Sequence, residues 1–215
     1  MTTKKRVGIL ISGRGSNMQA LIEAARAPDY AAEIAVVISN RPAAPGLERA
    51  SEAGIAALTI DHKQYASREA FDAALDAALR GAGVDIVCNA GFMRILSEGF
   101  VEAWRDRHLN IHPSLLPAFR GLHSHEAAIA AGVCISGATV HFVRAEMDAG
   151  PIVAQAAVPV LAGDTPDTLA ERVLKAEHRL YPLALALVAS GAAWVEGENV
   201  RLAPSAGTQS IFVWL

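Results

Sequence analysis

The chain has 215 residues, of which 52% are hydrophobic and 19% are charged, and its formal net charge is −3. This composition excludes a disordered chain, and the length suits one large domain or two small ones. The lack of a basic block argues against a nucleic-acid partner, whose phosphates would have to be neutralised.

The sequence predicts neither a leader peptide nor a membrane span. The basic N-terminus precedes an apolar run that contains Gly8 and ends at Ser12, which is too short for a signal peptide. The most apolar later run, residues 183–188, is far shorter than the roughly 20 residues of a spanning helix. Cys88 and Cys134 lack metal-ligand spacing and are expected to be buried thiols. A cytoplasmic globular protein is therefore expected.

In the first half of the chain, short apolar runs alternate with helical patterns. Strands are predicted for residues 7–11, 34–38, 56–60, 84–88 and 109–112, because short apolar runs are typical of strands buried on both faces. Helices are predicted between them, at residues 18–25, up to about 53, 67–79 and 97–104. This alternation indicates βαβ units. It predicts an α/β, Rossmann-like fold with a mostly parallel central sheet and helices on both faces.

The loop after the first predicted strand has the composition of an anion site. Residues 12–17 read Ser-Gly-Arg-Gly-Ser-Asn and precede a helix, whose free N–H groups and dipole favour an anion. Ser16 and Gln19 fit a capping box. A dinucleotide fingerprint is not met, because Met18 occupies the third glycine position and no acidic residue follows the next strand. A monophosphate site is the better interpretation, and a plain tight turn is the alternative.

Two further features of this half point weakly to a ligand. Arg68 lies in the first turn of a predicted helix, where the dipole disfavours a cation, although a solvated arginine is the default interpretation. The apolar side chains of residues 92–96, a range that also contains Arg94, follow a strand at loop positions. They either cover the core or line an apolar pocket.

The run Asn110-Ile111-His112-Pro113 predicts a polar site at a strand end. Side chains alternate along a strand, so Asn110 and His112 point to the same side, and Pro113 ends the strand. Ligand sites in open α/β sheets lie at the carboxyl ends of strands. An amide beside an imidazole suits chemistry in which a carbonyl oxygen becomes negative. The alternative is a structural histidine before a proline turn.

The pattern changes after residue 120. A helix is predicted for residues 125–131, and two strands, 138–143 and 152–158, are joined by so short a connection that an antiparallel pair is expected. Thr165 and Pro166 have the cap and first-turn positions of a long helix that runs to about residue 190. Residues 193–202 suggest a terminal strand pair, and residues 203–215 a tail without an assigned role.

Several of these motifs together resemble one enzyme family. The glycine loop at residues 13–17, the segment 110–117 and Asp148 before Gly150-Pro151 coincide with residues 90–96 and 121–123. In this combination the chain resembles the phosphoribosylglycinamide formyltransferases, folate-dependent enzymes of purine synthesis, over roughly residues 6–200. The Ser-Leu-Leu-Pro core at 114–117 is shared with a wider formyltransferase superfamily, whereas the loop with Asn17 narrows the resemblance.

The resemblance implies a reaction and a set of site residues. The formyl group of 10-formyltetrahydrofolate would pass to the amine of phosphoribosylglycinamide in de novo purine (IMP) biosynthesis, without a metal. Catalytic roles are implied for Asn110, His112 and Asp148, with His141 behind them. Binding of phosphoribosylglycinamide is implied for Gly15, Ser16, Asn17 and Glu177. Folate binding is implied for Arg68, Met93, Arg94, Ile95, Leu96, Asn110, Arg144 and Asp148.

The resemblance also implies an organisation. Residues 1–202 would form one formyltransferase domain, with a phosphate-binding half to about residue 105 and a catalytic and folate half from about residue 106. Small-molecule substrates are implied, with no nucleic acid and no membrane, for a monomer or a homodimer. Arg14, Arg120 and Ala149 depart from the family pattern, but none belongs to the implied catalytic trio.

The chemistry of the trio suits this reaction. When an amine attacks the formyl carbon, the carbonyl oxygen becomes an oxyanion, to which Asn110 and a protonated His112 can donate hydrogen bonds. A neighbouring carboxylate favours the charged form of histidine, so Asp148 is expected to raise the pKa of His112.

Three rival functions remain open from the sequence. A formyltetrahydrofolate deformylase would use water as the acceptor, and it is expected to carry an extra domain before Val7. A methionyl-tRNA formyltransferase is expected to carry an added C-terminal nucleic-acid-binding domain. A non-catalytic nucleotide- or folate-binding module would not need an intact Asn110, His112 and Asp148.

Overall fold

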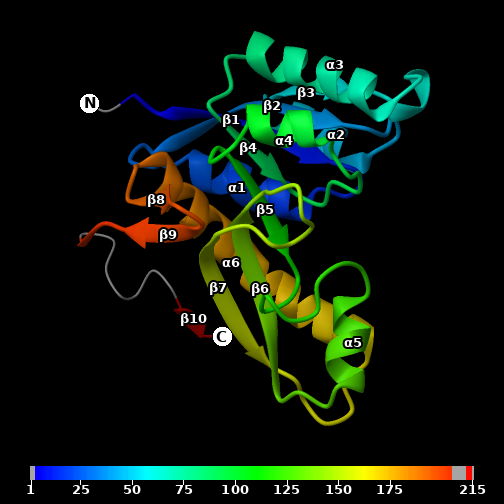
Figure 1. The fold of residues 1–215 in the computed structure, drawn as a ribbon, viewed down its shortest axis with the longest axis vertical. Helices are drawn as coiled ribbons and strands as arrows, with labels where there is room; N and C mark the ends of the chain where they lie inside the picture. Colours follow the sequence, from blue (N-terminus) through cyan, green and yellow to red (C-terminus); the bar gives the residue numbers. More distant parts are fainter. Residues whose placement is uncertain (1–2, 205–211, 215) are drawn as a thin grey trace. The chain divides into compact units, whose positions relative to one another are not determined.

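The structure is a computed structural model that describes residues 3–204 and 212–214 (Figure 1). The chain divides into two compact units, residues 1–110 and 111–215. The division falls within one strand, β5 (His108–His112), whose first three residues belong to the first unit and whose last two belong to the second.

The first unit is built on a parallel sheet. Its strands are β1 (Lys5–Ile11), β2 (Ala32–Ser39), β3 (Ala56–Thr59), β4 (Ile86–Asn89) and the start of β5. The order is β3-β2-β1-β4-β5, and every pairing is parallel. The interior strand β4 is buried along its whole length, as expected for a sheet covered on both faces.

Helices cover both faces of this sheet. They are α1 (Ser16–Ala25), α2 (Pro45–Glu52), the single 3₁₀ turn η1 (His62–Gln64), α3 (Arg68–Gly81) and α4 (Glu98–Ala103). Leu10 packs in one cluster with Phe71 of α3 and Phe100 of α4, whereas its neighbour Ile11 faces Gly46 of α2. Because adjacent strand residues point to opposite faces, α2 lies on the face opposite α3 and α4 (Figure 1).

The predicted capping box at the start of α1 is wrong. The N-cap is Gly15, with φ +70°, and no side chain caps the helix there. Ser16 is already helical, and the backbone N–H of Gln19 donates to the Gly15 carbonyl oxygen (3.0 Å). The loop therefore enters the helix through the left-handed region, which glycine adopts without the strain that a serine would meet.

The second unit combines an antiparallel pair with a long helix. Strands β6 (Ile135–Phe142) and β7 (Ile152–Pro159) pair antiparallel, with Thr139 opposite Gln155, as predicted. Helix α5 (Ser124–Ala130) precedes them, and α6 (Pro166–Ala189) follows and packs on both strands. A separate hairpin of β8 (Ala193–Glu196) and β9 (Asn199–Leu202) confirms the predicted terminal strand pair.

Helix α6 begins where the sequence predicts. The Thr165 side chain accepts a hydrogen bond from the Thr168 N–H (3.2 Å), and the Thr168 hydroxyl accepts one from the Thr165 N–H (2.9 Å). Pro166 occupies the first turn, where a missing N–H costs nothing. Asp164 lies just before the cap and accepts two hydrogen bonds from the Arg172 guanidinium, from Nη1 to Oδ2 (2.7 Å) and from Nη2 to Oδ1 (2.9 Å). These contacts fix the start of the helix.

Cys134 and the C-terminal residues differ from what the sequence predicts. Cys88 is buried, but Cys134 is exposed, because it lies in the turn between α5 and the exposed first residue of β6, Ile135. Within the predicted tail, β10 (Phe212–Trp214) pairs in parallel with β7, and residues 205–211 and 215 lie outside the described part. No helix in the described ranges is both long and apolar enough to cross a membrane. The predicted α/β, Rossmann-like class is confirmed.

Candidate active site

Strand β5 presents the polar pair that the sequence predicts. Asn110 and His112 alternate with the buried Leu109 and Ile111, so both fall on one side of the strand. The Asn110 residue is half-buried, and His112 is 6% exposed. A polar ring so far removed from water needs hydrogen-bond partners within the protein.

Asp148 reaches His112 from the loop between β6 and β7. Its Oδ2 lies 3.4 Å from Nδ1 of His112, and its Oδ1 lies 3.7 Å from Nε2 of His141 on β6. The backbone N–H of Gly121 donates to Oδ2 (2.9 Å). The Asp148 side chain is 9% exposed, so its charge depends on these neighbours. The structure thus brings together the predicted residues His112, Asp148 and His141.

The loop reaches this position through an unusual backbone. Asp148 has φ +54°, which lies in the left-handed region. Residues other than glycine, asparagine and aspartate adopt this region less often. Two residues later, a Cβ on Gly150 would collide with the carbonyl of Phe142 at the end of β6. Only glycine permits this close approach, which closes the loop and directs Asp148 toward the end of β5.

The two histidines hold their protons differently. His112 Nε2 lies 2.9 Å from the Phe119 carbonyl oxygen, which only accepts, so this nitrogen carries a hydrogen, and Nδ1 faces the Asp148 carboxylate. A doubly protonated His112 would satisfy both acceptors. His141 Nδ1 donates to the Phe142 carbonyl (2.9 Å), and burial lowers the pKa of His141, against an upward effect of that hydrogen bond and of Asp148. Of the two histidines, His112 lies closer to the Asp148 carboxylate, at 3.4 Å against 3.7 Å.

The glycine loop opens onto a separate cavity in the first unit. The cavity has a volume of about 320 Å³, and its only charged lining residues are two arginines. It is lined by Ser12, Gly13, Arg14, Gly15, Ser16, Asn17, Arg41, Ala90, Gly91 and Met93. Two guanidinium groups at the N-terminus of α1 make this a place for an anion. The predicted residues Gly15, Ser16 and Asn17 all belong to it.

A small polar network holds this cavity in shape. The Ser12 hydroxyl donates to Oδ1 of Asn40 (2.6 Å) and accepts from the backbone N–H of Met93 (2.8 Å). The Asn40 amide nitrogen lies 3.1 Å from Nδ1 of His62. Arg41, next to Asn40, enters the lining. The sequence analysis assigned no role to Asn40 and Arg41, although polar residues directly after β2 were the available signal.

The segment after β4 lies partly against the core and partly at the loop cavity. Leu96 packs against the hydrophobic core of the first unit, whereas Met93 lines the loop cavity. Met93 and Ile95 are 61% and 65% exposed, which is unusual for large apolar side chains. Arg94 and Arg68 are exposed as well. Part of this segment therefore exposes apolar side chains.

Two other predicted binding residues lie in the second unit. Glu177 is buried on α6, at 6% exposed. The Arg144 guanidinium donates from Nε to Glu198 before β9 (2.9 Å) and from Nη1 to the Val143 carbonyl (3.2 Å). A ligand of Arg144 would share it with these acceptors. Phe119 and Gly121, which orient His112 and Asp148, were not predicted, because their backbone groups leave no trace in residue type.

Comparison with known proteins agrees with this geometry. Residues 5–185 match the formyl transferase family. Phosphoribosylglycinamide formyltransferase of Escherichia coli K12 is 46% identical over 89% of this chain and 94% of that protein. The crystal structure of glycinamide ribonucleotide transformylase 1 from Symbiobacterium toebii is 51% identical, with a TM-score of 0.90 over 93% of this chain and 94% of that chain. The chain therefore belongs to the formyl transferase family, among the phosphoribosylglycinamide formyltransferases.

Animal relatives contain a similar sequence within a longer protein. The trifunctional purine biosynthetic protein adenosine-3 of Bos taurus is 55% identical over 93% of this chain, but the match covers 20% of that protein. The chain thus spans about a fifth of the length of these relatives.

Proposed function

We propose that this chain transfers the formyl group of 10-formyltetrahydrofolate to the amine of phosphoribosylglycinamide in de novo purine biosynthesis. The observation that carries this proposal is His112 held between the Phe119 carbonyl and the Asp148 carboxylate. This arrangement suits a protonated imidazole, which is a hydrogen-bond donor for an oxyanion. The family membership and the anion cavity at the glycine loop support the choice of substrates.

In the proposed reaction, the amine nitrogen forms a bond to the formyl carbon, and the carbonyl electron pair moves onto oxygen. Asn110 and the Nε2–H of His112 donate to this oxygen, the latter by exchanging the Phe119 carbonyl for the substrate. Asp148 keeps the other ring nitrogen oriented. When the carbonyl re-forms, the bond to the folate nitrogen breaks. The amine loses a proton, and the folate nitrogen gains one.

We propose for the residues of each unit the binding roles that the resemblance implies. Gly15, Ser16 and Asn17, with the guanidinium groups of Arg14 and Arg41, would hold the phosphate in the loop cavity. Glu177 would contact the same substrate. For the folate, Arg68 and Arg144 supply cations for its carboxylates. The apolar surface for the folate is supplied by Met93, Ile95 and Leu96, beside Arg94.

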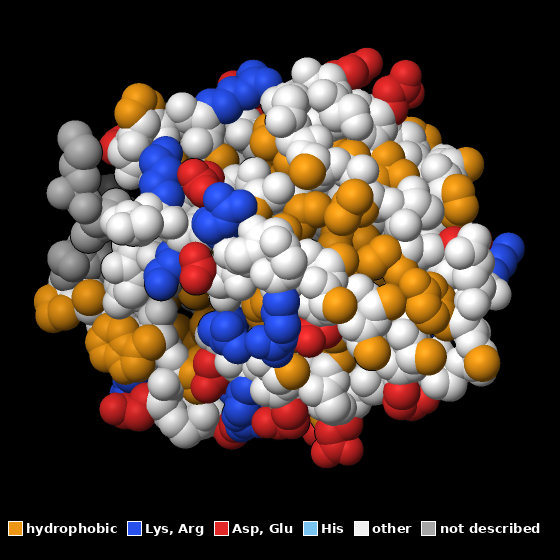
Figure 2. All heavy atoms as spheres, turned by 90° about the horizontal axis from the view of Figure 1, so that it is seen from above, with side chains coloured by type: hydrophobic (Ala, Val, Ile, Leu, Met, Phe, Trp, Pro, Cys, Tyr) orange, Lys and Arg blue, Asp and Glu red, His pale blue; other side chains and the backbone are white. Residues whose placement is uncertain are grey.

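We also propose the kind of partner and the location of the protein. On the face in Figure 2, described Lys and Arg side chains lie among Asp and Glu side chains. Small-molecule substrates alone are proposed, for a monomer or homodimer in the cytoplasm. Neither cysteine in the described part forms a disulfide, in keeping with that location.

The experiment that tests the proposal measures release of tetrahydrofolate from 10-formyltetrahydrofolate with and without phosphoribosylglycinamide. Release is expected only when the amine substrate is present, with formylated product in equal amount. Release of formate at the same rate without the amine would identify a deformylase. Binding of folate with no release under either condition would identify a non-catalytic module.

A further inference from the structure

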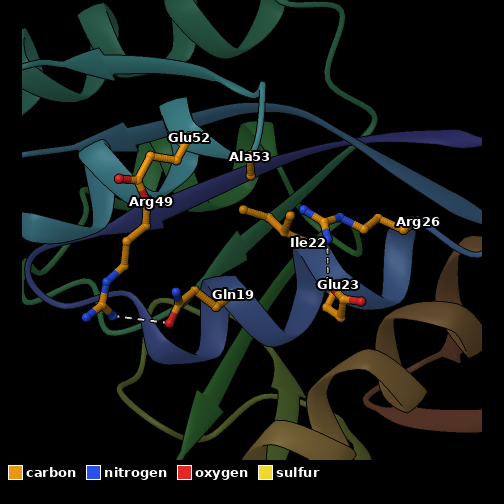
Figure 3. Close-up of a pocket in the computed structure, with 7 residues that line it drawn as sticks. All are labelled: Gln19, Ile22, Glu23, Arg26, Arg49, Glu52 and Ala53. Carbon is orange, nitrogen blue, oxygen red and sulfur yellow. Dashed lines mark hydrogen bonds and ion pairs between the residues drawn. The ribbon is translucent and has the colours of Figure 1, made fainter.

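The start of α2 lies directly against the glycine loop. The Gly46 N–H donates to the Gly13 carbonyl oxygen (3.1 Å), and Nη1 of Arg49, one turn along α2, donates to the Arg14 carbonyl oxygen (3.0 Å). The same Nη1 also donates to Oε1 of Gln19 on α1 (3.1 Å; Figure 3). Two consecutive carbonyls of the loop are thus held by α2, and Arg49 joins α1, α2 and the loop.

This contact sets the direction of the loop N–H groups. A trans peptide points its C=O and its N–H to opposite sides. The Gly13 carbonyl shares a peptide with the Arg14 N–H, and the Arg14 carbonyl shares one with the Gly15 N–H. Since both carbonyls face α2, both N–H groups face away from it. Within the described ranges neither N–H has a protein acceptor, so both are free for an anion.

The contact leaves little room for adjustment. A Cβ on Gly46 would lie 3.0 Å from the Gly13 carbonyl oxygen and 2.5 Å from Cδ1 of Ile11. A Cβ on Gly15 would lie 3.3 Å from the Cα of Gly46. A Cβ at either position would require neighbouring atoms to shift, and the Gly13 carbonyl cannot turn without moving α2. The Arg14 carbonyl is held instead by the Arg49 side chain.

Arg49 does not belong to the lining of the loop cavity. It lines instead a shallow hollow of about 230 Å³ between α1 and α2, together with Gln19, Arg26 and other residues of the two helices. Figure 3 shows its guanidinium directed to Gln19, while Arg26 pairs with Glu23 (2.9 Å). An effect of Arg49 on the bound phosphate would therefore pass through the loop.

We infer that Arg49 is a positioning residue for the phosphate end of the substrate, which it serves by holding the Arg14 carbonyl so that the Gly15 N–H faces the loop cavity. This inference rests on the proposed function. In the absence of Arg49, the Arg14–Gly15 peptide can rotate and withdraw one donor from the phosphate. The catalytic cluster at His112 needs no such support.

The test compares three variants of the full chain. Arg49→Met keeps the apolar stem and removes the donor, Arg49→Lys keeps a cationic donor, and Arg26→Met is the matched loss of charge in the same hollow. We expect Arg49→Met to raise the KM for phosphoribosylglycinamide about tenfold, the effect of one hydrogen bond to a charged group. The KM for the folate and kcat should stay within about twofold. Arg49→Lys should recover most of the loss, and Arg26→Met should show none.

Three results would overturn the inference. The first is an unchanged KM for phosphoribosylglycinamide in Arg49→Met. The second is an equal rise of this KM in Arg26→Met, which would indicate a general charge effect. The third is a joint change of both KM values and kcat in Arg49→Met, which would indicate damage to the fold. Binding of inorganic phosphate by titration calorimetry gives an independent test: Arg49→Met should bind it more weakly than wild type and Arg26→Met. If the wild-type protein binds inorganic phosphate but does not formylate phosphoribosylglycinamide, the proposed function fails. The comparison of phosphate binding among the variants then still tests the inference about the loop.

Discussion

At the scale of single residues, the site depends on how one imidazole is held. His112 has an acceptor at each ring nitrogen, a backbone carbonyl at Nε2 and a carboxylate at Nδ1. His141 faces the same carboxylate, but burial disfavours its charged form. In the proposed reaction the carboxylate acts through His112, the histidine nearer to it, and the Nε2–H would be the donor that turns to the substrate.

Asp148→Asn tests this division of roles. Removing the carboxylate takes away the acceptor that faces Nδ1 of His112, and loss of an oxyanion donor typically lowers turnover by about 10²–10³. We expect a fall of that size in kcat for Asp148→Asn and for His112→Ala. Because residues that act as a unit are strongly non-additive, the double variant should be little worse than the more impaired single variant.

The control for this cycle is Glu171→Gln, the same loss of a carboxylate at an exposed position of α6. Its turnover should equal that of wild type. Fully multiplicative losses in the Asp148 and His112 double variant would show that the two residues act independently.

At the scale of secondary-structure elements, each functional side chain is positioned by an element end. His112 ends β5, the glycine loop joins β1 to α1, and α2 supports that loop. Helix α6 is the longest element of the second unit, and its first turn is fixed by the reciprocal bonds of Thr165 and Thr168. This helix packs on both β6 and β7, the strands that flank the Asp148 loop.

Thr165→Ala should lower the free energy of unfolding by about 1 kcal/mol, the usual cost of losing an N-cap side chain. Thr165→Ser, which retains the hydroxyl, should lose little. The measurement is a urea unfolding curve with the slope compared among the variants. Equal losses in the alanine and serine variants would mean that the methyl group, and not the cap, is responsible.

At the scale of the whole molecule, several buried groups link stability to pH. Burial lowers the pKa of His125, His141 and His178 below the ordinary histidine value. Hydrogen bonds from Arg172 and from the Leu161 N–H lower the pKa of Asp164 far below that of a free carboxyl. Each of these shifts makes the unfolded chain bind more protons than the folded one as the pH falls.

We therefore expect stability to decline on acidification in two ranges. The histidine contribution is complete above about pH 6.5 and is lost as the pH falls from there toward the lowered pKa values. The Asp164 contribution is present above the ordinary carboxyl pKa and is lost as the pH falls through its lowered value. Urea midpoints at about pH 7.5 and about pH 5.5 test the first range.

A variant separates one histidine from the rest. His178 has a buried Nε2 without a hydrogen-bond partner in the described part of the chain, and it takes no part in the proposed reaction. His178→Gln removes one of the three groups and should make the midpoint less sensitive to acidification than in wild type. A wild-type midpoint that is constant or rises between these two pH values would contradict the expected linkage.

The sequence by itself determined the class of fold and which strand and loop ends were candidates for a site. Apolar runs such as residues 34–38 and the stripe containing Phe71, Leu75 and Leu79 predict strands and helices, because burial repeats with the period of each element. The start of α6 followed from the residue types at Thr165 and Pro166 alone. The amide and imidazole at the end of β5 followed from strand alternation, which also needs no distant contact.

Only the tertiary structure decided how these places are completed. It moved the cap of α1 from Ser16 to Gly15, because the loop carbonyls are taken by α2. It exposed Cys134, and it brought Asp148 to His112 and His141 through the close approach of Gly150 to β6. Periodicity reports which face a residue occupies within its own element. Contacts between backbone groups and side chains far apart in the chain depend on how elements pack, and residue type alone does not encode them.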